Sequence, residues 1–375
     1  MRFNSGLTRI AVAMLLLVTS LVLVIGCRPR SPQSVQLADL GSEVEPPRSD
    51  DAQGQEEAPY DPGARLYEVA PKVEVTLRDS QRERDVLLTV RHPAKLHDGP
   101  FPLIIFSHGA GGSGEAFPGL SEQLAARGYV VVQPWHSDSI QLARRRGELG
   151  FDPQRGLEQV VDRVDLPDRL RDVAFIMAST AEIEKALDRE SLIDASRVGL
   201  AGHSAGAMTT QAAAGLRFFP PRRGARGPGV STPIAGIQAF AVISGQGTTR
   251  PSITEQSWRD CMRPMLVIAG SEDVSVVSNE TPESRRHPFE HANADGTKYL
   301  AYMTGATHGA YQGRAGERVP REQQPENIDW IERITTLTTV AMMDAYIKRL
   351  DAARRWLDED KIMMIEGGEL EWLRK

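Results

Sequence analysis

Cysteine, aromatic residues and surplus positive charge are all scarce in this sequence of 375 residues. Two cysteines cannot build a disulfide scaffold, so a small disulfide-stabilised fold is excluded. The 44 lysines and arginines are outnumbered by 50 acids, which disfavours a partner with a phosphate backbone, such as nucleic acid. Charged residues make up 25% of the chain and hydrophobic residues 41%, which excludes a wholly disordered chain and a multi-span membrane protein. The composition is that of a globular protein.

A long uncharged run lies near the N-terminus, where residues 10–25 follow Arg2 and Arg9. A basic start followed by an apolar stretch is typical of a secretory signal. The run ends in Val-Ile-Gly-Cys, which is similar to a bacterial lipobox, where the signal is cut before a cysteine that then carries lipid. We therefore predict a signal peptide over residues 1–26, lipidation of Cys27 and export to the cell envelope on a bacterial membrane. An uncleaved N-terminal anchor and simple secretion are the alternatives.

The segment after Cys27 has the composition of a linker. Residues 28–65 contain six prolines, eight acids and four arginines, with few large apolar side chains. Such a stretch buries too little surface to offset the entropy of ordering its backbone. We predict a disordered tether over residues 27–65, which would hold the folded part away from the membrane.

Apolar runs of strand length alternate with helical patterns from residue 66 onward. Strands are expected over residues 73–77, 85–90, 102–106, 129–132, 197–201, 239–243, 265–269 and 299–303. Helices are expected over residues 117–127, 166–187, 205–216 and 328–357. Continuous apolar runs are typical of strands buried on both faces of a parallel sheet. The order predicts one α/β domain over residues 66–375, with a mostly parallel central sheet and helices on both faces, and a loop over residues 217–233.

A pentapeptide of the G-x-S-x-G type, Gly-His-Ser-Ala-Gly, occupies residues 202–206. It follows an expected strand and precedes an expected helix, which is the context that a nucleophile elbow requires. The glycines allow a tight turn beside the neighbouring strand and helix. The context predicts that Ser204 is a nucleophile whose Oγ lies above the sheet edge.

A serine hydroxyl needs a base, and the base needs a group that orients it. In elbow hydrolases the chain order is serine, acid, histidine. Asp273 follows the strand expected at 265–269, and His308 follows the last expected strand. Glu272 is a rival for the acid, but adjacent side chains point apart and Asp273 is preferred. We predict a triad of Ser204, Asp273 and His308.

Two amide donors are expected to bind the oxyanion of a tetrahedral intermediate. One is the amide of Ala205, directly after the nucleophile, and the other is the amide of Ala110, in the glycine-rich loop after the strand at 102–106. Trp135 and His136 follow the next strand and are candidates for lining the substrate cleft. Packing in the core is the alternative for Trp135.

Two other enzyme classes have weaker support. Gly109, Gly111 and Gly114 match a dinucleotide fingerprint with Asp138 as the later acid, but two expected strands precede it, and the triad would have no explanation. His136, Asp138, His287 and His291 could be read as metal ligands, although no established ligand spacing connects them. Neither a metal nor an organic cofactor is expected.

Residues 72–310 resemble an α/β-hydrolase, and within that superfamily the dienelactone hydrolase branch that holds platelet-activating-factor acetylhydrolases and cutinase-like polyester hydrolases. The resemblance rests on residues 106–113, 124–131, 171–173 and 202–206. Bacterial dienelactone hydrolases proper use cysteine where this chain has Ser204, so dienelactone itself is not the expected substrate. The His-Gly-Gly-Gly motif of one lipase branch is also absent, because Ala110 stands at its third position.

These patterns together predict a serine hydrolase of carboxylic esters that works through an acyl-enzyme. The expected partners are a small-molecule or lipid ester and, through the N-terminal lipid, a membrane. A serine peptidase is the alternative within hydrolases, because the same triad cleaves amides. A membrane-tethered binding module that has lost its chemistry is the alternative outside enzymes.

Overall fold

The structure, a computed structural model, describes residues 59–95, 98–148, 156–219, 228–275, 278–317 and 319–375. The predicted signal peptide, the lipidation site at Cys27 and most of the predicted tether fall in residues 1–58 and therefore lie outside the described residues. Within the described ranges, no helix combines the length and the apolar character needed to cross a membrane.

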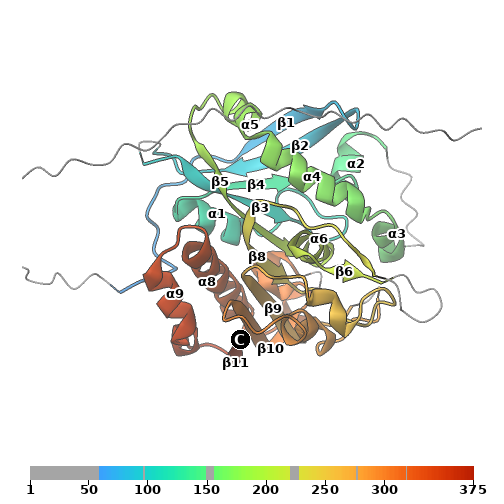
Figure 1. The fold of residues 1–375 in the computed structure, drawn as a ribbon, viewed down its shortest axis with the longest axis vertical. Helices are drawn as coiled ribbons and strands as arrows, with labels where there is room; N and C mark the ends of the chain where they lie inside the picture. The colour runs from blue at the N-terminus through green and yellow to red at the C-terminus, as the bar shows by residue number, and fades with distance from the viewer. Residues whose placement is uncertain (1–58, 96–97, 149–155, 220–227, 276–277, 318) are drawn as a thin grey trace, which may run out of the picture. The chain divides into compact units, whose positions relative to one another are not determined.

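A nine-stranded sheet forms the centre of the fold, in the order β1-β2-β4-β3-β5-β8-β9-β10-β11 (Figure 1). Its strands are β1 (Val73–Asp79), β2 (Arg84–Arg91), β3 (Phe101–Ser107), β4 (Val130–Pro134), β5 (Ile193–His203), β8 (Ile237–Ile243), β9 (Met265–Glu272), β10 (Lys298–Thr307) and β11 (Leu370–Arg374). The six strands from β4 to β10 run parallel, whereas β2 is antiparallel to both of its neighbours. The predicted fold class, a mostly parallel sheet with helices on both faces, is confirmed.

The sheet is buried on both faces, as the continuous apolar runs predicted. In β3, Leu103 and Ile105 belong to one hydrophobic core, while Ile104 and Phe106 belong to the other. Successive side chains of a strand point to opposite faces, so each buried strand contributes to both cores.

Helices cover the two faces of the sheet (Figure 1). They are α1 (Pro118–Ala126), α2 (Ile140–Arg145), α3 (Gly156–Asp162), α4 (Leu166–Ala178), α5 (Thr180–Ala186), α6 (Ala205–Ala214), α7 (His287–Glu290), α8 (Ile328–Tyr346) and α9 (Asp351–Asp358). Side chains of α1, α8 and α9 pack in one core, and those of α4, α5 and α6 pack in the other. The predicted apolar face of α8 is buried along its length, from Ile328 to Val340.

Two helices predicted as continuous are each divided in two. The helix expected over 166–187 breaks at Ser179, which separates α4 from α5. The helix expected over 328–357 ends at Tyr346, because Arg349 adopts a left-handed conformation with φ of 59° and α9 begins at Asp351. The hydrophobic pattern continues through both breaks. A prediction based on periodicity therefore gave one continuous helix in each case.

Two further elements have no counterpart in the sequence predictions. The C-terminal strand β11 pairs antiparallel with β10 and closes that edge of the sheet. The segment predicted as a loop over 217–233 contains two short paired strands, β6 (Arg217–Phe218) and β7 (Val230–Ser231). β6 and β7 form a separate two-stranded sheet, whereas the pairing of β11 with β10 joins segments that are distant in sequence.

The folded part begins before residue 66, the start predicted from the sequence. Tyr60 packs edge-on against Trp356 and donates a hydrogen bond of 2.9 Å to Asp344 in α8. Asp344 also accepts from Arg127 at 2.6 Å and from Tyr129 at 2.8 Å. This buried carboxylate therefore ties residues 59–65, which were expected to be disordered, to α1 and α8.

Replacing Asp344 with alanine is expected to destabilise the fold by about 3–5 kcal/mol, because the buried Arg127 guanidinium would lose its counter-ion. Urea unfolding measures the loss. The control is Asp260→Ala, which removes an ion pair with Arg217 that is partly exposed and is expected to cost less than about 1 kcal/mol. Equal losses in the two variants would show that the Asp344 contacts are not a principal anchor.

Candidate active site

Ser204 lies on a sharp turn between β5 and α6. Its backbone has φ of 57° and ψ of −115°, a strained conformation for a residue with a side chain. Glycine is required at position 206, two residues later, because a Cβ added there would lie 1.9 Å from the Ser107 carbonyl oxygen at the end of β3. Gly202 is equally crowded, since its added Cβ would lie 2.3 Å from the oxygen of Gly206. The turn has the geometry predicted from the pentapeptide.

The structure brings Ser204, His308 and Asp273 together in one hydrogen-bonded row. The Ser204 Oγ lies 3.0 Å from His308 Nε2, and His308 Nδ1 lies 2.8 Å from Asp273 Oδ1. A carboxylate can only accept, so Nδ1 carries the proton and Nε2 faces the serine with its lone pair. The rival acid Glu272 is exposed at the end of β9. This arrangement can move a proton from the serine hydroxyl to the imidazole.

Asp273 is fully buried and has several charge-stabilising partners. Its Oδ2 accepts from the Tyr311 hydroxyl at 2.7 Å, and the Arg285 Nε lies 3.3 Å from Oδ1. Burial alone would raise the pKa of Asp273, but the hydrogen bond from His308 and the charge of Arg285 outweigh it and lower the pKa to about 2. The carboxylate is therefore ionised at any pH near neutral.

Ser244 is a fourth residue in this row that the sequence analysis missed. It directly follows β8, is fully buried and has φ of 54°. Its Oγ lies 2.9 Å from His308 Nδ1 and forms a hydrogen bond with Asp273. The available signal was its position as the first residue after a buried parallel strand, which it shares with Ser204, Asp273 and His308.

His203, the residue directly before Ser204, contacts His308. Its Nε2 donates to the backbone oxygen of His308 at 2.9 Å, and the two rings lie 4.9 Å apart. Burial and the nearby His308 lower the pKa of His203 to about 3, so this ring stays neutral. Because the His203 ring is neutral, it places no positive charge beside His308 that would oppose protonation of the His308 ring.

The two predicted oxyanion donors both have amides available. Ala205 is the first residue of α6, so its N–H has no acceptor within the helix. In the described part of the chain, the Ala110 amide donates to no other group. Its loop passes directly over Ser204, since a Cβ added at Gly109 would lie 3.4 Å from the Ser204 Cβ. Both alanines and Ser204 are partly exposed, so the row is open to solvent.

Trp135 and His136 do not line this opening. Both are fully buried. The Trp135 Nε1 donates to Thr89 at 2.9 Å, and the Arg145 guanidinium covers its ring at 4.2 Å. His136 lies between Ser107 and Asp172, at 2.8 and 2.7 Å. The prediction that they form the substrate cleft is therefore corrected: one packs in the core, and the other belongs to a buried polar network.

The geometry also removes the basis of the dinucleotide alternative. Asp138, the acid that a ribose would require, is buried and paired with Arg169 at 2.7 Å. Gly114 packs against the Trp135 indole, where an added Cβ would lie 2.4 Å from Nε1. The glycines are explained by the tight path of this loop.

The residues of the metal alternative fall into two separate groups. His136 and Asp138 belong to the network around Arg169, and His287 and His291 lie on and beside α7. With Glu290, these last two bring one possible ligand atom each within 4.8 Å of one another. The Nδ1 of His287, however, already accepts from the Thr248 amide at 3.1 Å, and Glu290 pairs with Arg286. These residues have no part in the triad.

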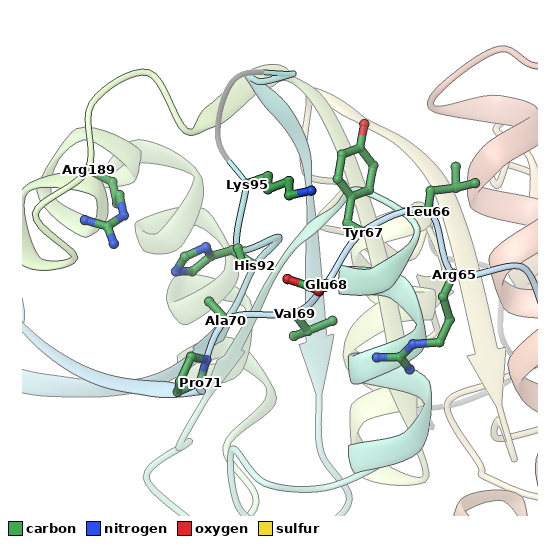
Figure 2. Close-up of a pocket in the computed structure, with 11 residues that line it drawn as sticks. Arg65, Leu66, Tyr67, Glu68, Val69, Ala70, Pro71, His92, Lys95 and Arg189 are labelled. Carbon is green, nitrogen blue, oxygen red and sulfur yellow. The ribbon is translucent and has the colours of Figure 1, made fainter.

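A hollow of about 800 Å³ lies elsewhere on the surface, lined by residues 65–71, 92, 94, 95 and 189 (Figure 2). Its cationic side chains include Arg65, Lys95 and Arg189. None of the triad residues or predicted oxyanion donors contributes to it. The hollow therefore does not mark the site built around Ser204.

Comparison with known families agrees with this architecture. Residues 83–144 match the family model of platelet-activating factor acetylhydrolase, isoform II. The chain is similar to the platelet-activating factor acetylhydrolase branch of the α/β-hydrolases. The match covers β3, the loop with Ala110 and β4, but not the triad residues. It confirms the resemblance expected from the sequence and supports a hydrolase of the lipase and esterase type. No curated protein matches the chain.

The low pKa of Asp273 predicts an acid-dependent contribution to stability. An aspartate has a pKa near 3.9 when unfolded, so the contribution is complete above about pH 5 and is lost as pH falls toward 2. In Asp273→Asn this contribution is missing at every pH. The difference in unfolding free energy between wild type and variant should therefore shrink by about 1 kcal/mol between pH 6 and pH 3.

Urea unfolding at several pH values measures this difference. Glu272→Gln is the matched control, because its carboxylate is the exposed neighbour of Asp273. We expect the control to follow the wild type at each pH. A difference between wild type and Asp273→Asn that stays constant with pH would contradict the prediction.

Proposed function

We propose that this protein is a serine hydrolase of carboxylic esters. The observation that carries the proposal is the row Ser204–His308–Asp273, with heavy-atom distances of 3.0 and 2.8 Å, on a strained turn at the sheet edge. Nucleophile, base and orienting acid at hydrogen-bond distance are the arrangement that activates a serine hydroxyl.

In the proposed acylation step, the Ser204 Oγ attacks the ester carbonyl carbon while His308 Nε2 takes its proton. Asp273, ionised and hydrogen-bonded to Nδ1, holds the tautomer and stabilises the positive charge that forms on the ring. The carbonyl oxygen becomes an oxyanion that accepts from the amides of Ala205 and Ala110. His308 then gives its proton to the alcohol, which leaves.

Water completes the cycle in the proposed deacylation step. His308 takes a proton from water, and the resulting hydroxide attacks the acyl carbon of the ester on Ser204. The tetrahedral intermediate collapses when the Ser204 oxygen leaves and recovers a proton from His308. The carboxylic acid product is released, and the chemistry is complete without a cofactor.

Short acyl groups, with acetyl first, are the class we propose. The support is the name of the matching family, which describes an acetylhydrolase of platelet-activating factor. Longer lipid esters and polyester-like chains are the other candidates from the resemblance. The predicted lipid on Cys27 would place the catalytic part at the membrane, where ester lipids are concentrated.

Ser204→Ala is expected to lower kcat for p-nitrophenyl acetate by on the order of 10⁴- to 10⁶-fold, because removal of a triad nucleophile abolishes the acyl-enzyme route. Hydrolysis of p-nitrophenyl esters from acetate to palmitate, together with labelling by a fluorophosphonate probe, makes the test. Wild type should be labelled and the variant should not. Activity highest at short chains would support acetyl or short-acyl substrates, and a long-chain maximum would overturn that class.

Equal rates in wild type and Ser204→Ala, or no activity and no labelling in either protein, would contradict the proposed function. The second result would favour the inert binding module. Labelling of Ser204 combined with cleavage of peptide amides in preference to esters would favour the peptidase.

Ser244→Ala is expected to lower kcat by about 10-fold with little change in KM, because His308 would lose one of the two groups that orient its Nδ1. Ser191→Ala is the matched control, since Ser191 has the same φ of 54° but is exposed. Steady-state kinetics on p-nitrophenyl acetate make the comparison. Equal kcat values in the two variants would show that Ser244 does not help to orient His308.

A further inference from the structure

A buried ion pair lies directly beneath the loop that carries Ala110. Arg169 of α4 and Asp138 are both without exposure in their side chains. They form a two-point contact, with Nε to Oδ1 at 2.9 Å and Nη2 to Oδ2 at 2.7 Å. The nearby guanidinium also holds the pKa of Asp138 well below its usual range, even though burial by itself would raise it.

The remaining hydrogen bonds of this pair go to the loop. Arg169 Nη1 donates to the oxygen of His108 at 2.7 Å, and Nη2 donates to the oxygen of Gly109 at 3.2 Å. On the other side of Ala110, the amide of Gly111 donates to Asp138 Oδ2 at 3.0 Å. The backbone before and after Ala110 is thus fixed to one rigid pair of charges.

The contact with Gly109 controls the direction of the predicted oxyanion donor. The carbonyl of Gly109 and the N–H of Ala110 belong to the same peptide unit, which is planar and trans, so the two groups point in opposite directions. Because Arg169 binds the Gly109 oxygen, the Ala110 N–H points away from Arg169. A positively charged donor on the oxygen also polarises the peptide and strengthens its N–H as a donor.

His108 gives the same carbonyl a second donor. Its Nδ1 lies 2.6 Å from the Gly109 oxygen, and its Nε2 accepts from the His136 amide at 3.2 Å. Burial and the charge of Arg169 lower the pKa of His108 to about 3, which keeps the ring neutral and this tautomer in place. The Gly112 amide also donates to this oxygen, at 3.1 Å. The Gly109 carbonyl is therefore held by three donors, which leave the loop little freedom.

Stability alone is a weak reason for such a pair. Two charges lose their hydration when they are buried, and a buried ion pair often contributes no more than well-packed apolar residues would. Its distinctive property here is geometry, because, among the described residues, every side-chain hydrogen bond that Arg169 does not give to Asp138 goes to residues 107–109. A catalytic amide needs such fixed orientation, since misplacement weakens its bond to the developing oxyanion.

We propose that Arg169, together with Asp138, is a positioning pair that orients and polarises the Ala110 amide for binding of the oxyanion. The inference rests on the proposed serine hydrolase function. Neither residue touches a reacting atom, and both act through the Gly109–Ala110 peptide and its neighbours.

Arg169→Met is the principal test, because methionine keeps much of the side-chain length without the donors. With p-nitrophenyl acetate, kcat is expected to fall about 10- to 100-fold, while KM changes less than about 3-fold, because the lost interaction acts mainly in the transition state. The inhibition constant of phenylboronic acid, which forms a tetrahedral adduct with serine, should rise in parallel with the loss in kcat. Arg169→Lys should fall between wild type and Arg169→Met.

Arg127→Met is the matched control. Arg127 forms a second buried ion pair, with Nη2 at 2.6 Å from Asp344 Oδ2, but it contacts residues 61 and 64 instead of the loop with Ala110. This variant should lose stability in urea and keep kcat and boronate affinity close to wild type. If Arg169→Met behaves like the control, with lowered stability and unchanged kcat and boronate affinity, the proposal is overturned.

Asp138→Asn provides a variant that retains an acceptor for the Gly111 amide in case Arg169→Met does not fold. It should lower kcat and boronate affinity together, by less than Arg169→Met, and unchanged values would again overturn the proposal. Failure of the proposed serine hydrolase function gives a different result, because wild type and Ser204→Ala would then have equal esterase activity. If activity depends on Ser204 but the Arg169 and Asp138 variants have wild-type kcat and boronate affinity, only the positioning role is rejected.

Discussion

The parallel register of four neighbouring strands is the constraint on which the site depends. β5, β8, β9 and β10 lie side by side and end at the same edge of the sheet. The first residues after them are Ser204, Ser244, Asp273 and His308. Residues up to 104 positions apart in the chain therefore meet in a single hydrogen-bonded row without any dedicated loop architecture. The edge position also leaves the row partly open to solvent, while the strands beneath it are rigid and buried on both faces.

Much of this arrangement could be predicted from the sequence because its signals are local. Continuous apolar runs located the strands, and each triad residue stands directly after one of them. The loop predicted to bind an oxyanion was located for the same reason, as the glycine-rich segment after β3. Strand β11 and the breaks at Ser179 and Arg349 were missed, because edge pairing and chain reversal depend on distant contacts.

The polar residues behind the site could not be assigned from the sequence. Arg169 occurs in an amphipathic helix, where an arginine usually marks the solvated face, yet it is fully buried. His136 follows a strand at the functional edge and so resembled a cleft residue, but Asp172 and Ser107 hold it inside. Residue type and spacing do not distinguish a side chain that faces substrate from one that faces the next layer of protein. That distinction depends on the charged side chains that the residue contacts in the folded protein. Here α4 contributes these side chains, and it lies in a different part of the chain.

Strain in the backbone links the stability of the sheet to the geometry of the row. Ser204 and Ser244 both have φ near 55°, a conformation that costs a residue with a side chain on the order of 1–3 kcal/mol. Each is held there by backbone bonds to the neighbouring strand, from the Ser204 amide to Ile243 at 3.0 Å and from the Ser244 amide to Ile268 at 2.8 Å. Glycine at either position would relieve the strain but would remove the hydroxyl that faces His308. The buried sheet must therefore supply enough stability to hold two serines in unfavourable conformations, and the hydrogen-bonded row depends on that stability.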